Sequence, residues 1–137
     1  MMYVKRRETF SASHRLYNPS LSETENVEIF DKCANANGHG HNYVLEVTVR
    51  GETQKESGYV IDLKQLKLLI RKEIIEKVDH KHLNHDVDFL NDIIPTAENL
   101  AKAFWEVLAP RIRDGALYSV VVKETENNSV EYRGERA

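Results

Sequence analysis

The residues of this chain that most clearly could do chemistry are three histidines at the ends of two strand-like segments. His39 and His41 are two residues apart, at the start of a run that alternates as a β-strand does. Side chains two apart on a strand share a face, so a strand that begins by His39 would project both imidazoles together. His14 ends the first strand-like segment. Three neutral imidazoles without a fourth protein ligand describe a catalytic zinc site with one open position.

A pair of strand-end histidines that is satisfied only by hydrogen bonds is the alternative to a metal site. The grouping of the histidines favours the metal, because all six fall in three places: at 14, at 39 and 41, and at 80, 82 and 85. The only cysteine, Cys33, lies six residues before His39. A structural zinc would usually take four ligands, mostly thiolates, which one cysteine does not supply.

Cys33 stands in a polar stretch beside the predicted zinc site, where it could be a fourth ligand or a base. A free cysteine is often just a small buried apolar residue. Here its neighbours include Asp31, Lys32 and Asn35, which argue against apolar surroundings. A nearby cation or imidazolium lowers the pKa of a thiol and makes its thiolate available to accept a proton.

Two further groups carry polar side chains that could take part in a reaction. Asp79-His80 follows a predicted helix, and an imidazole that is oriented by a carboxylate can return a proton to a substrate. Alternatively, the pair caps the helix C-terminus. Glu124 ends an apolar strand, where its carboxylate could accept two parallel hydrogen bonds from a pterin-like or guanine-like edge. The alternative is a solvated strand-end glutamate.

The composition of the chain limits the classes of protein to which it can belong. The chain has 137 residues, of which 41% are hydrophobic and 30% charged, as in a soluble globular domain, and we expect a single domain over 1–137. A net charge of −3 gives no electrostatic footprint for nucleic acid. No apolar run reaches the length of a membrane span, and one cysteine fits a reducing compartment, so we expect a cytoplasmic protein.

Apolar periodicity predicts the order ββααββ. We expect strands over 2–13, 41–50, 116–124 and 129–133, and a long polar loop over 17–38. Asp62 opens a helix whose apolar stripe comprises Leu63, Leu66, Ile70, Ile74 and Val78. Thr96 is a suitable N-cap for the second helix.

These elements predict an α+β fold: a four-stranded antiparallel sheet with two helices on one face. Such a sheet has open edges, and edge-to-edge assembly into a closed oligomeric barrel would cover them.

Seven segments, taken together and in order, resemble the 6-pyruvoyl-tetrahydropterin synthase and 6-carboxytetrahydropterin synthase family of tunnelling-fold (T-fold) proteins. They cover nearly the whole chain. The segments are 10–14 (FSASH), 33–43 (CANANGHGHNY), 60–62 (VID), 79–84 (DHKHLN), 95–100 (PTAENL), 123–125 (KET) and 132–135 (YRGE).

The resemblance implies a role for each matching residue. His14, His39 and His41 would bind zinc, and Cys33 would be the base that removes a carbon-bound proton. Asp79 and His80 would be its acid/base partners, Glu124 would anchor the pterin ring, and Thr96 would lie near that ring. The resemblance also implies a homohexamer, a dimer of trimers whose twelve-stranded barrels close the sheet edges, with active sites between subunits.

Two reactions occur in this family. One branch converts 7,8-dihydroneopterin triphosphate to 6-pyruvoyltetrahydropterin, a carbon–oxygen lyase reaction that eliminates triphosphate on the way to tetrahydrobiopterin. The other makes 6-carboxytetrahydropterin for queuosine and releases acetaldehyde. The five residues between Cys33 and His39 resemble the first branch, where the second typically has three, and the segment 125–130 also resembles the first. The segment 95–98 is closer to the second. We therefore expect a pyruvoyl synthase.

Two other classes of function compete with this one. One is a zinc hydrolase of the same fold class, such as a cyclohydrolase that acts on a purine-like ring, but the single cysteine and the Asp79-His80 pair fit C–H proton transfer better. A non-catalytic pterin- or metal-binding module would not need both Cys33 and His80.

Overall fold

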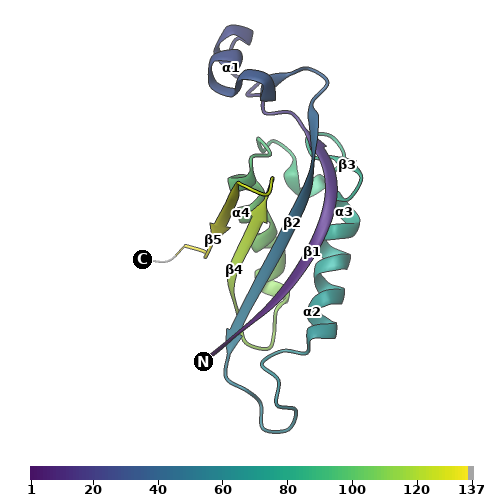
Figure 1. Cartoon of the computed structure of the whole chain (residues 1–137), viewed down its shortest axis with the longest axis vertical. Helices are drawn as coiled ribbons and strands as arrows, with labels where there is room; N and C mark the ends of the chain where they lie inside the picture. The colour runs from purple at the N-terminus through teal and green to yellow at the C-terminus, as the bar shows by residue number, and fades with distance from the viewer. Residues whose placement is uncertain (136–137) are drawn as a thin grey trace.

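One five-stranded sheet, in the order β3-β1-β2-β4-β5, organises the chain. The computed structural model describes residues 1–135, so the last two residues of the expected domain, 1–137, lie outside it. The strands are β1 (Met2–His14), β2 (His39–Gly51), β3 (Lys81–His82), β4 (Ala116–Lys123) and β5 (Ser129–Tyr132). Figure 1 shows β1 and β2 as two long strands side by side, running most of the length of the molecule.

β1 and β2 form the central ladder. They pair antiparallel over their whole length, from Met2 opposite Gly51 to His14 opposite His39. The inward side chains alternate along β2, where Tyr43, Leu45, Val47 and Val49 are all fully buried. This alternation continues to the end of the ladder, so that the histidines there share the face that the helices cover.

Two helical segments cover that face. The first runs through α2 (Leu63–Ile70), a π-helical turn (Arg71–Ile75) and α3 (Glu76–Val78), and the second is α4 (Ala97–Leu108). The predicted N-caps are confirmed: the Asp62 side chain accepts from the Lys64 amide, and that of Thr96 from the Asn99 amide. The predicted stripe is fully buried at Leu66, Ile70, Ile74 and Val78, whereas Leu63, in the first turn, is 49% exposed.

The α+β architecture is as predicted, with two additions. The stretch 17–38 is not all loop, because it contains α1 (Glu23–Phe30) and a 3₁₀ turn (Asp31–Ala34). A capping box starts α1: the hydroxyl of Ser22 accepts from the amide of Glu25, and the Glu25 side chain accepts from the amide of Ser22. This short helix projects beyond one end of the sheet (Figure 1).

The second addition is β3, a two-residue strand that pairs parallel with β1 and makes the sheet five-stranded rather than four-stranded. It is too short to show periodicity in the sequence. With β3 at one edge and β5 at the other, the sheet keeps two open edges within a single chain. In residues 1–135, no helix combines the length and the apolarity needed to cross a membrane.

Candidate active site

Three histidines meet where β1 ends and β2 begins. His14 lies opposite His39 in the ladder, and His41 follows on the same face of β2. One ring nitrogen from each lies within 4.8 Å of the other two. Gly38 permits the tight entry into β2, since its φ is +73° and a Cβ there would lie 2.8 Å from the carbonyl oxygen of His14. The predicted convergence of the three imidazoles is therefore present.

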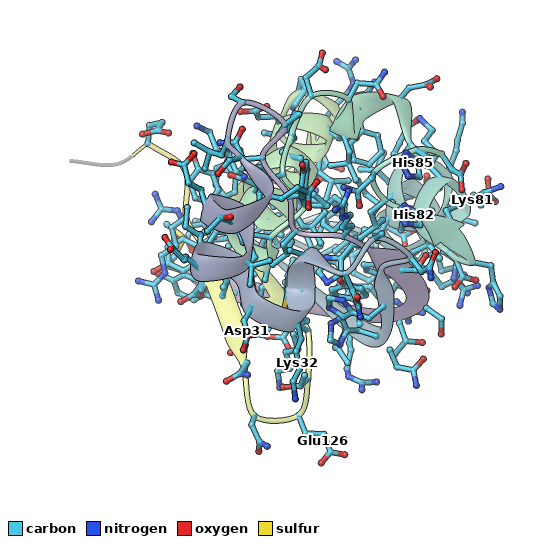
Figure 2. All side chains as sticks on the ribbon, turned by 90° about the horizontal axis from the view of Figure 1, so that it is seen from above. Asp31, Lys32, Lys81, His82, His85 and Glu126 are labelled. Atoms are coloured by element: carbon cyan, nitrogen blue, oxygen red, sulfur yellow. The ribbon has the colours of Figure 1, made fainter. Side chains whose placement is uncertain are left out.

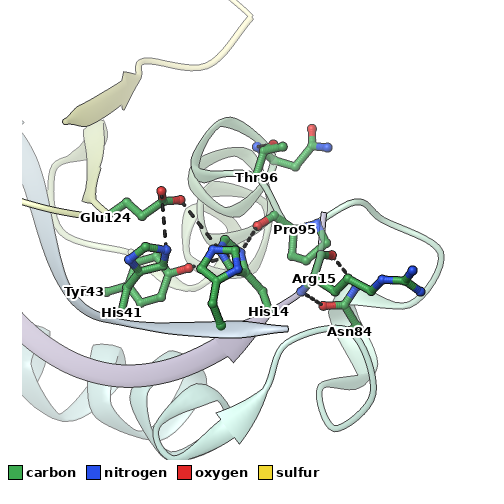
Figure 3. A network of polar contacts seen from close by, with 10 residues as sticks. His14, Arg15, His41, Tyr43, Asn84, Pro95, Thr96 and Glu124 are labelled. Atoms are coloured by element: carbon green, nitrogen blue, oxygen red, sulfur yellow. Dashed lines mark hydrogen bonds and ion pairs between the residues drawn. The ribbon is translucent and has the colours of Figure 1, made fainter. Parts of the chain in front are cut away.

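A hydrogen bond fixes the tautomer of His14, which is fully buried. Its Nδ1 lies 2.8 Å from the carbonyl oxygen of Pro95. A carbonyl oxygen only accepts, so Nδ1 carries the proton and Nε2 keeps its lone pair. The Tyr43 hydroxyl lies 3.3 Å from the same Nδ1. Outer hydrogen bonds of this kind orient metal-binding imidazoles (Figure 3).

The free lone pairs of the cluster fit a tetrahedral metal ion. The Nε2 atoms of His14 and His39 are 3.1 Å apart. Zinc–nitrogen bonds of about 2.0–2.1 Å place two tetrahedral ligands roughly 3.3 Å apart. Nδ1 of His39 and Nε2 of His41 are buried without a hydrogen-bond partner within residues 1–135. Buried polar atoms without a partner are costly, and a cation among them would satisfy those directed at it.

Burial also keeps two of these imidazoles neutral. Loss of solvation lowers the pKa of His14 below 6.5; the hydrogen bond to Pro95 and the charge of Glu124 oppose this shift, while His39 and His41 add to it. Loss of solvation likewise lowers the pKa of His41, against the opposing effect of Glu124. Only a neutral imidazole offers a lone pair to a metal, so the lowered pKa values favour metal binding at neutral pH.

Glu124 faces the cluster from the residue after β4. Its carboxylate oxygens lie 3.6 Å from Nε2 of His41 and 4.0 Å from Nε2 of His14. The side chain is only 25% exposed, and Figure 3 shows it directed at both rings. Glu124 is therefore not a solvated strand-end residue. Its negative charge can offset a divalent cation or accept hydrogen bonds from a ligand.

A pocket of about 400 Å³ opens beside Glu124. Thr96 and Ala97 line it from the start of α4, and apolar walls come from Leu16, after β1, and from Phe30, the last residue of α1. The pocket therefore combines two carboxylates, those of Glu98 and Glu124, with apolar surfaces, which suits the binding of a flat heterocycle. The structure places Thr96 and Glu124 on the wall of the same pocket.

Cys33 lies close to the cluster along the chain but is not in it. It is a free, half-buried cysteine in the 3₁₀ turn, and it is not one of the three grouped ligands. Its carbonyl oxygen accepts from the amide of Leu16, two residues after His14, at 2.8 Å. This bond ties the cysteine segment to the end of β1. In this arrangement Cys33 is not a fourth ligand.

Asp79 and His80 lie beside β1 rather than beside Glu124. One carboxylate oxygen of Asp79 accepts from the Ser11 amide at 2.9 Å, and the other lies 3.0 Å from Nδ1 of His80. The Ser11 amide and the imidazole of His80 hold the pKa of Asp79 below its ordinary value. The His80 side chain is 82% exposed, and its backbone has a φ of +60°. It lines a shallow groove of about 410 Å³, whose wall includes His41 but not Cys33, Thr96 or Glu124.

Two features of the site were not predicted, and only one of them has a signal in the sequence. Tyr43 continues the spacing of His39 and His41, so the same alternation could have placed its hydroxyl in the cluster. The bond from the Pro95 carbonyl to His14 spans 81 residues and has no sequence signal.

The remaining histidines, His82 and His85, stack on each other with ring centroids 4.3 Å apart.

The chain has a single sheet with an antiparallel ladder at its centre, helices on one face of that sheet, and three histidines at paired strand ends. These features define a T-fold protein with a three-histidine site. The family model described as "6-pyruvoyl tetrahydropterin synthase" matches residues 3–135. The chain belongs to this family, which confirms the resemblance seen in the sequence.

Relatives from several eukaryotes are similar over almost the whole chain. A human protein described as "6-pyruvoyl tetrahydrobiopterin synthase" is 48% identical, over 96% of this chain and 91% of its own length. A *Dictyostelium discoideum* protein of the same description is 47% identical over 96% of both. An *Aquifex aeolicus* "6-carboxy-5,6,7,8-tetrahydropterin synthase" is 31% identical, over 92% of this chain and 94% of its own.

Solved structures agree with the fold. The structure of 6-pyruvoyl tetrahydropterin synthase from *Caenorhabditis elegans* superposes with a TM-score of 0.92 at 41% identity, covering 98% of this chain and 96% of that one. The *Plasmodium vivax* structure of the same description has a TM-score of 0.66 at 20% identity and supports the fold alone.

The cluster predicts one divalent metal ion per chain. We expect His14→Ala to lose stoichiometric zinc, because it removes the one ligand whose tautomer is fixed by a buried hydrogen bond. His85→Ala, which removes an exposed imidazole, serves as the matched control and should retain the metal. Zinc content after dialysis measures both. Equal zinc in the two variants would show that the metal binds elsewhere.

The lowered pKa values also predict the direction of the pH dependence. Protons compete with the metal only below the pKa of each ligand, and burial moves the pKa of His14 and His41 downward. The bound fraction should therefore hold through pH 6.5 and decline below it. Titration with a zinc-sensitive dye from pH 8 to pH 4 checks this, and release that begins above pH 6.5 would contradict it.

Proposed function

We propose that this chain is a zinc-dependent 6-pyruvoyl-tetrahydropterin synthase, which converts 7,8-dihydroneopterin triphosphate to 6-pyruvoyltetrahydropterin and eliminates triphosphate. The observation that carries the proposal is the cluster of His14, His39 and His41 with the Glu124 carboxylate 3.6 Å from it and a pocket at its side. A metal-binding face and a pterin-binding carboxylate then meet at one site. The bond broken is carbon–oxygen, so the enzyme is a lyase that acts on a phosphate ester.

The pyruvoyl reaction is favoured over the carboxypterin reaction by the relatives. Those described as pyruvoyl synthases reach 48% identity, whereas the carboxypterin synthase is 31% identical. The five-residue spacing between Cys33 and His39 agrees with this order. This spacing outweighs the segment 95–98, which had favoured the carboxypterin branch.

The three histidines would hold the zinc ion. When bound there, zinc supplies a Lewis acid that polarises an oxygen of the substrate side chain and acidifies the neighbouring C–H bond. The protein residues fix where this happens. The Pro95 carbonyl holds the ring of His14, and the lowered pKa values of His14 and His41 keep the lone pairs of these two imidazoles available.

Glu124 and Thr96 would bind the pterin ring. The carboxylate of Glu124 can accept two parallel N–H bonds from the ring edge, which fixes the orientation of the ring in its plane. Thr96 lines the same pocket, and its hydroxyl accepts from the amide of Asn99 at 3.2 Å, so its position is fixed as well. With the ring held here, the three-carbon side chain would extend along the histidine cluster.

Cys33 would act as the base. Its Sγ would accept the proton from the substrate carbon, while His80 would move a second proton. Nδ1 of His80 is occupied by the Asp79 carboxylate, so Nε2 is the nitrogen that faces solvent and can exchange a proton with a ligand. Asp79 orients the ring of His80.

The separation of His80 from Glu124 within one chain supports an active site that is shared between subunits. His80 is anchored beside Ser11 at the β3 edge of the sheet, whereas Glu124 follows β4 on the other side of the central ladder. Both sheet edges are open, and closing them edge to edge would bring the β3 edge of one chain toward another. We propose a homohexamer, a dimer of trimers, in the cytoplasm.

Product identification tests the proposed reaction. Incubation of the zinc-loaded protein with 7,8-dihydroneopterin triphosphate should yield 6-pyruvoyltetrahydropterin and one equivalent of triphosphate by anaerobic mass spectrometry. Stoichiometric acetaldehyde with 6-carboxytetrahydropterin would assign the other branch. No conversion of this substrate, with zinc bound, would reject the function.

Removal of the thiol tests the base. Cys33→Ala should reduce kcat by about 10²–10⁴-fold, the usual contribution of a positioned base, while zinc content and melting temperature remain unchanged. Cys33→Ser, which keeps a hydroxyl of similar size, should fall near the same level because a hydroxyl ionises far less readily. Near-normal turnover of Cys33→Ala would exclude this role.

Subunit mixing tests the shared site. Cys33→Ala and His80→Ala should each be nearly inactive alone, but hexamers assembled from a mixture should recover activity where an intact Cys33 and an intact His80 meet across an interface. A mixture of Cys33→Ala with the double variant contains no intact cysteine and is the control. Failure of the first mixture to exceed this control would place both residues of a working site on one chain.

A further inference from the structure

Arg15, the residue after His14, is held rigidly at the mouth of a second cleft. Its amide donates to Oδ1 of Asn84 and its carbonyl accepts from Nδ2 of the same side chain, both at 2.8 Å. These two bonds join the end of β1 to the segment after β3 (Figure 3). The backbone at Arg15 is thereby fixed from both sides.

The guanidinium of Arg15 is fixed as well. Its Nε donates to the carbonyl oxygen of Ala34 at 2.8 Å, and its Cζ lies 3.8 Å over the ring centroid of Tyr17. Ala34 follows Cys33 directly, so this bond ties the guanidinium to the segment of the proposed base. The positive charge is thus anchored next to the reaction centre, on a side away from Glu124 (Figure 3).

The guanidinium of Arg15 has no ion-pair partner in the part of the chain that the structure describes. Within residues 1–135, no carboxylate lies within 4.0 Å of it, and neither of its Nη groups has a hydrogen-bond partner. A planar guanidinium that is held through Nε and stacked on an aromatic ring presents its remaining N–H groups in a fixed fork. This geometry suits a phosphate group.

The cleft beside Arg15 has room for a polyphosphate. Its volume is about 630 Å³, and its walls include Asn84, His85 and the loop residues Asn18, Pro19 and Ser20. Seen from the end that carries α1, His85 lies with His82 on the β3 side of the molecule, and Lys32 lies apart from them (Figure 2). Asp92 is the one carboxylate among the residues that line the cleft. The cleft therefore combines the fixed positive charge of Arg15 and several polar side chains with apolar walls that include Ile93 and Ile94.

We infer that this cleft binds the triphosphate of the substrate through Arg15. The inference rests on the proposed function, which places the substrate side chain between the histidine cluster and Cys33. The triphosphate is attached to the far end of that side chain, so its binding group must lie near Cys33 but outside the cluster. Arg15 meets both conditions.

Binding of inorganic triphosphate to the full-length, zinc-loaded protein tests the inference by calorimetry. Arg15→Gln should weaken this binding about 10- to 100-fold, the range for a lost charge-assisted contact. Asp92→Asn removes the one negative charge from the wall and should strengthen binding about 2- to 5-fold. Arg113→Gln, which removes an exposed arginine before β4, is the charge-matched control and should not change it. Zinc content after each titration confirms that triphosphate has not extracted the metal.

Steady-state kinetics separate binding from positioning. Arg15→Gln should raise KM for 7,8-dihydroneopterin triphosphate by a similar factor, and should leave the affinity for 7,8-dihydroneopterin, which lacks the phosphates, unchanged. Arg15→Lys keeps the charge without the fork and should fall between. If Arg15→Gln lowers kcat but leaves triphosphate binding intact, Arg15 only supports the Cys33 turn and the inference fails.

The two proposals fail separately. Arginine-dependent triphosphate binding in a protein that does not convert the substrate would overturn the proposed function and leave the cleft assigned. Conversion of the substrate, with triphosphate affinity equal in wild type and Arg15→Gln, would overturn the cleft and leave the function.

Discussion

The pairing of β1 with β2 in a single register is the constraint on which the rest of the structure depends. With His14 opposite His39, the alternation of both strands points His14, His39 and His41 to the buried face. A slip of one residue would turn one strand's inward side chains outward, separating the histidines and exposing the apolar residues at the same time. The register that buries Tyr43 and Leu45 is thus the register that assembles the site. Core stability and site geometry have one cause.

The same burial sets the chemistry of the site. Taking His14 and His41 out of water disfavours their protonated forms, and the Pro95 carbonyl leaves the lone pair of His14 Nε2 directed into the cluster. Without a cation, nitrogens that are 3.1 Å apart and buried atoms without partners carry a cost. A divalent ion would remove that cost at the nitrogens directed at it, and the Glu124 carboxylate would offset its charge. The ends of β1 and β2 therefore favour the binding of a cation.

The sequence predicted those parts of this arrangement that follow from local periodicity. Alternation from His39 to Val49 fixed the common face of two histidines, and capping residues located the starts of α2 and α4. The helix within 17–38 was missed, although Ser22 and Glu25 form a recognisable capping box, because its apolar residues show little helical periodicity. The two residues of β3 were missed because they show no pattern at all.

Contacts between distant segments lay beyond local patterns. The approach of Pro95 to His14, and of Asn84 to Arg15, depends on how α4 and the segment after β3 pack against the end of β1. Glu124 looked like a solvated strand end because its position after β4 says nothing of what faces it. The separation of His80 from Glu124 within one chain was likewise invisible, although similarity to the family had suggested sites between subunits.

The central claim is that a zinc ion binds to three histidines and leaves one position open. X-ray absorption at the zinc edge of the loaded, substrate-free protein measures the ligand set directly. We expect three imidazole nitrogens at about 2.0–2.1 Å with one further light atom and no sulfur. A sulfur shell at about 2.3 Å would make Cys33 a permanent ligand and contradict both the open position and the role of its thiol as the base.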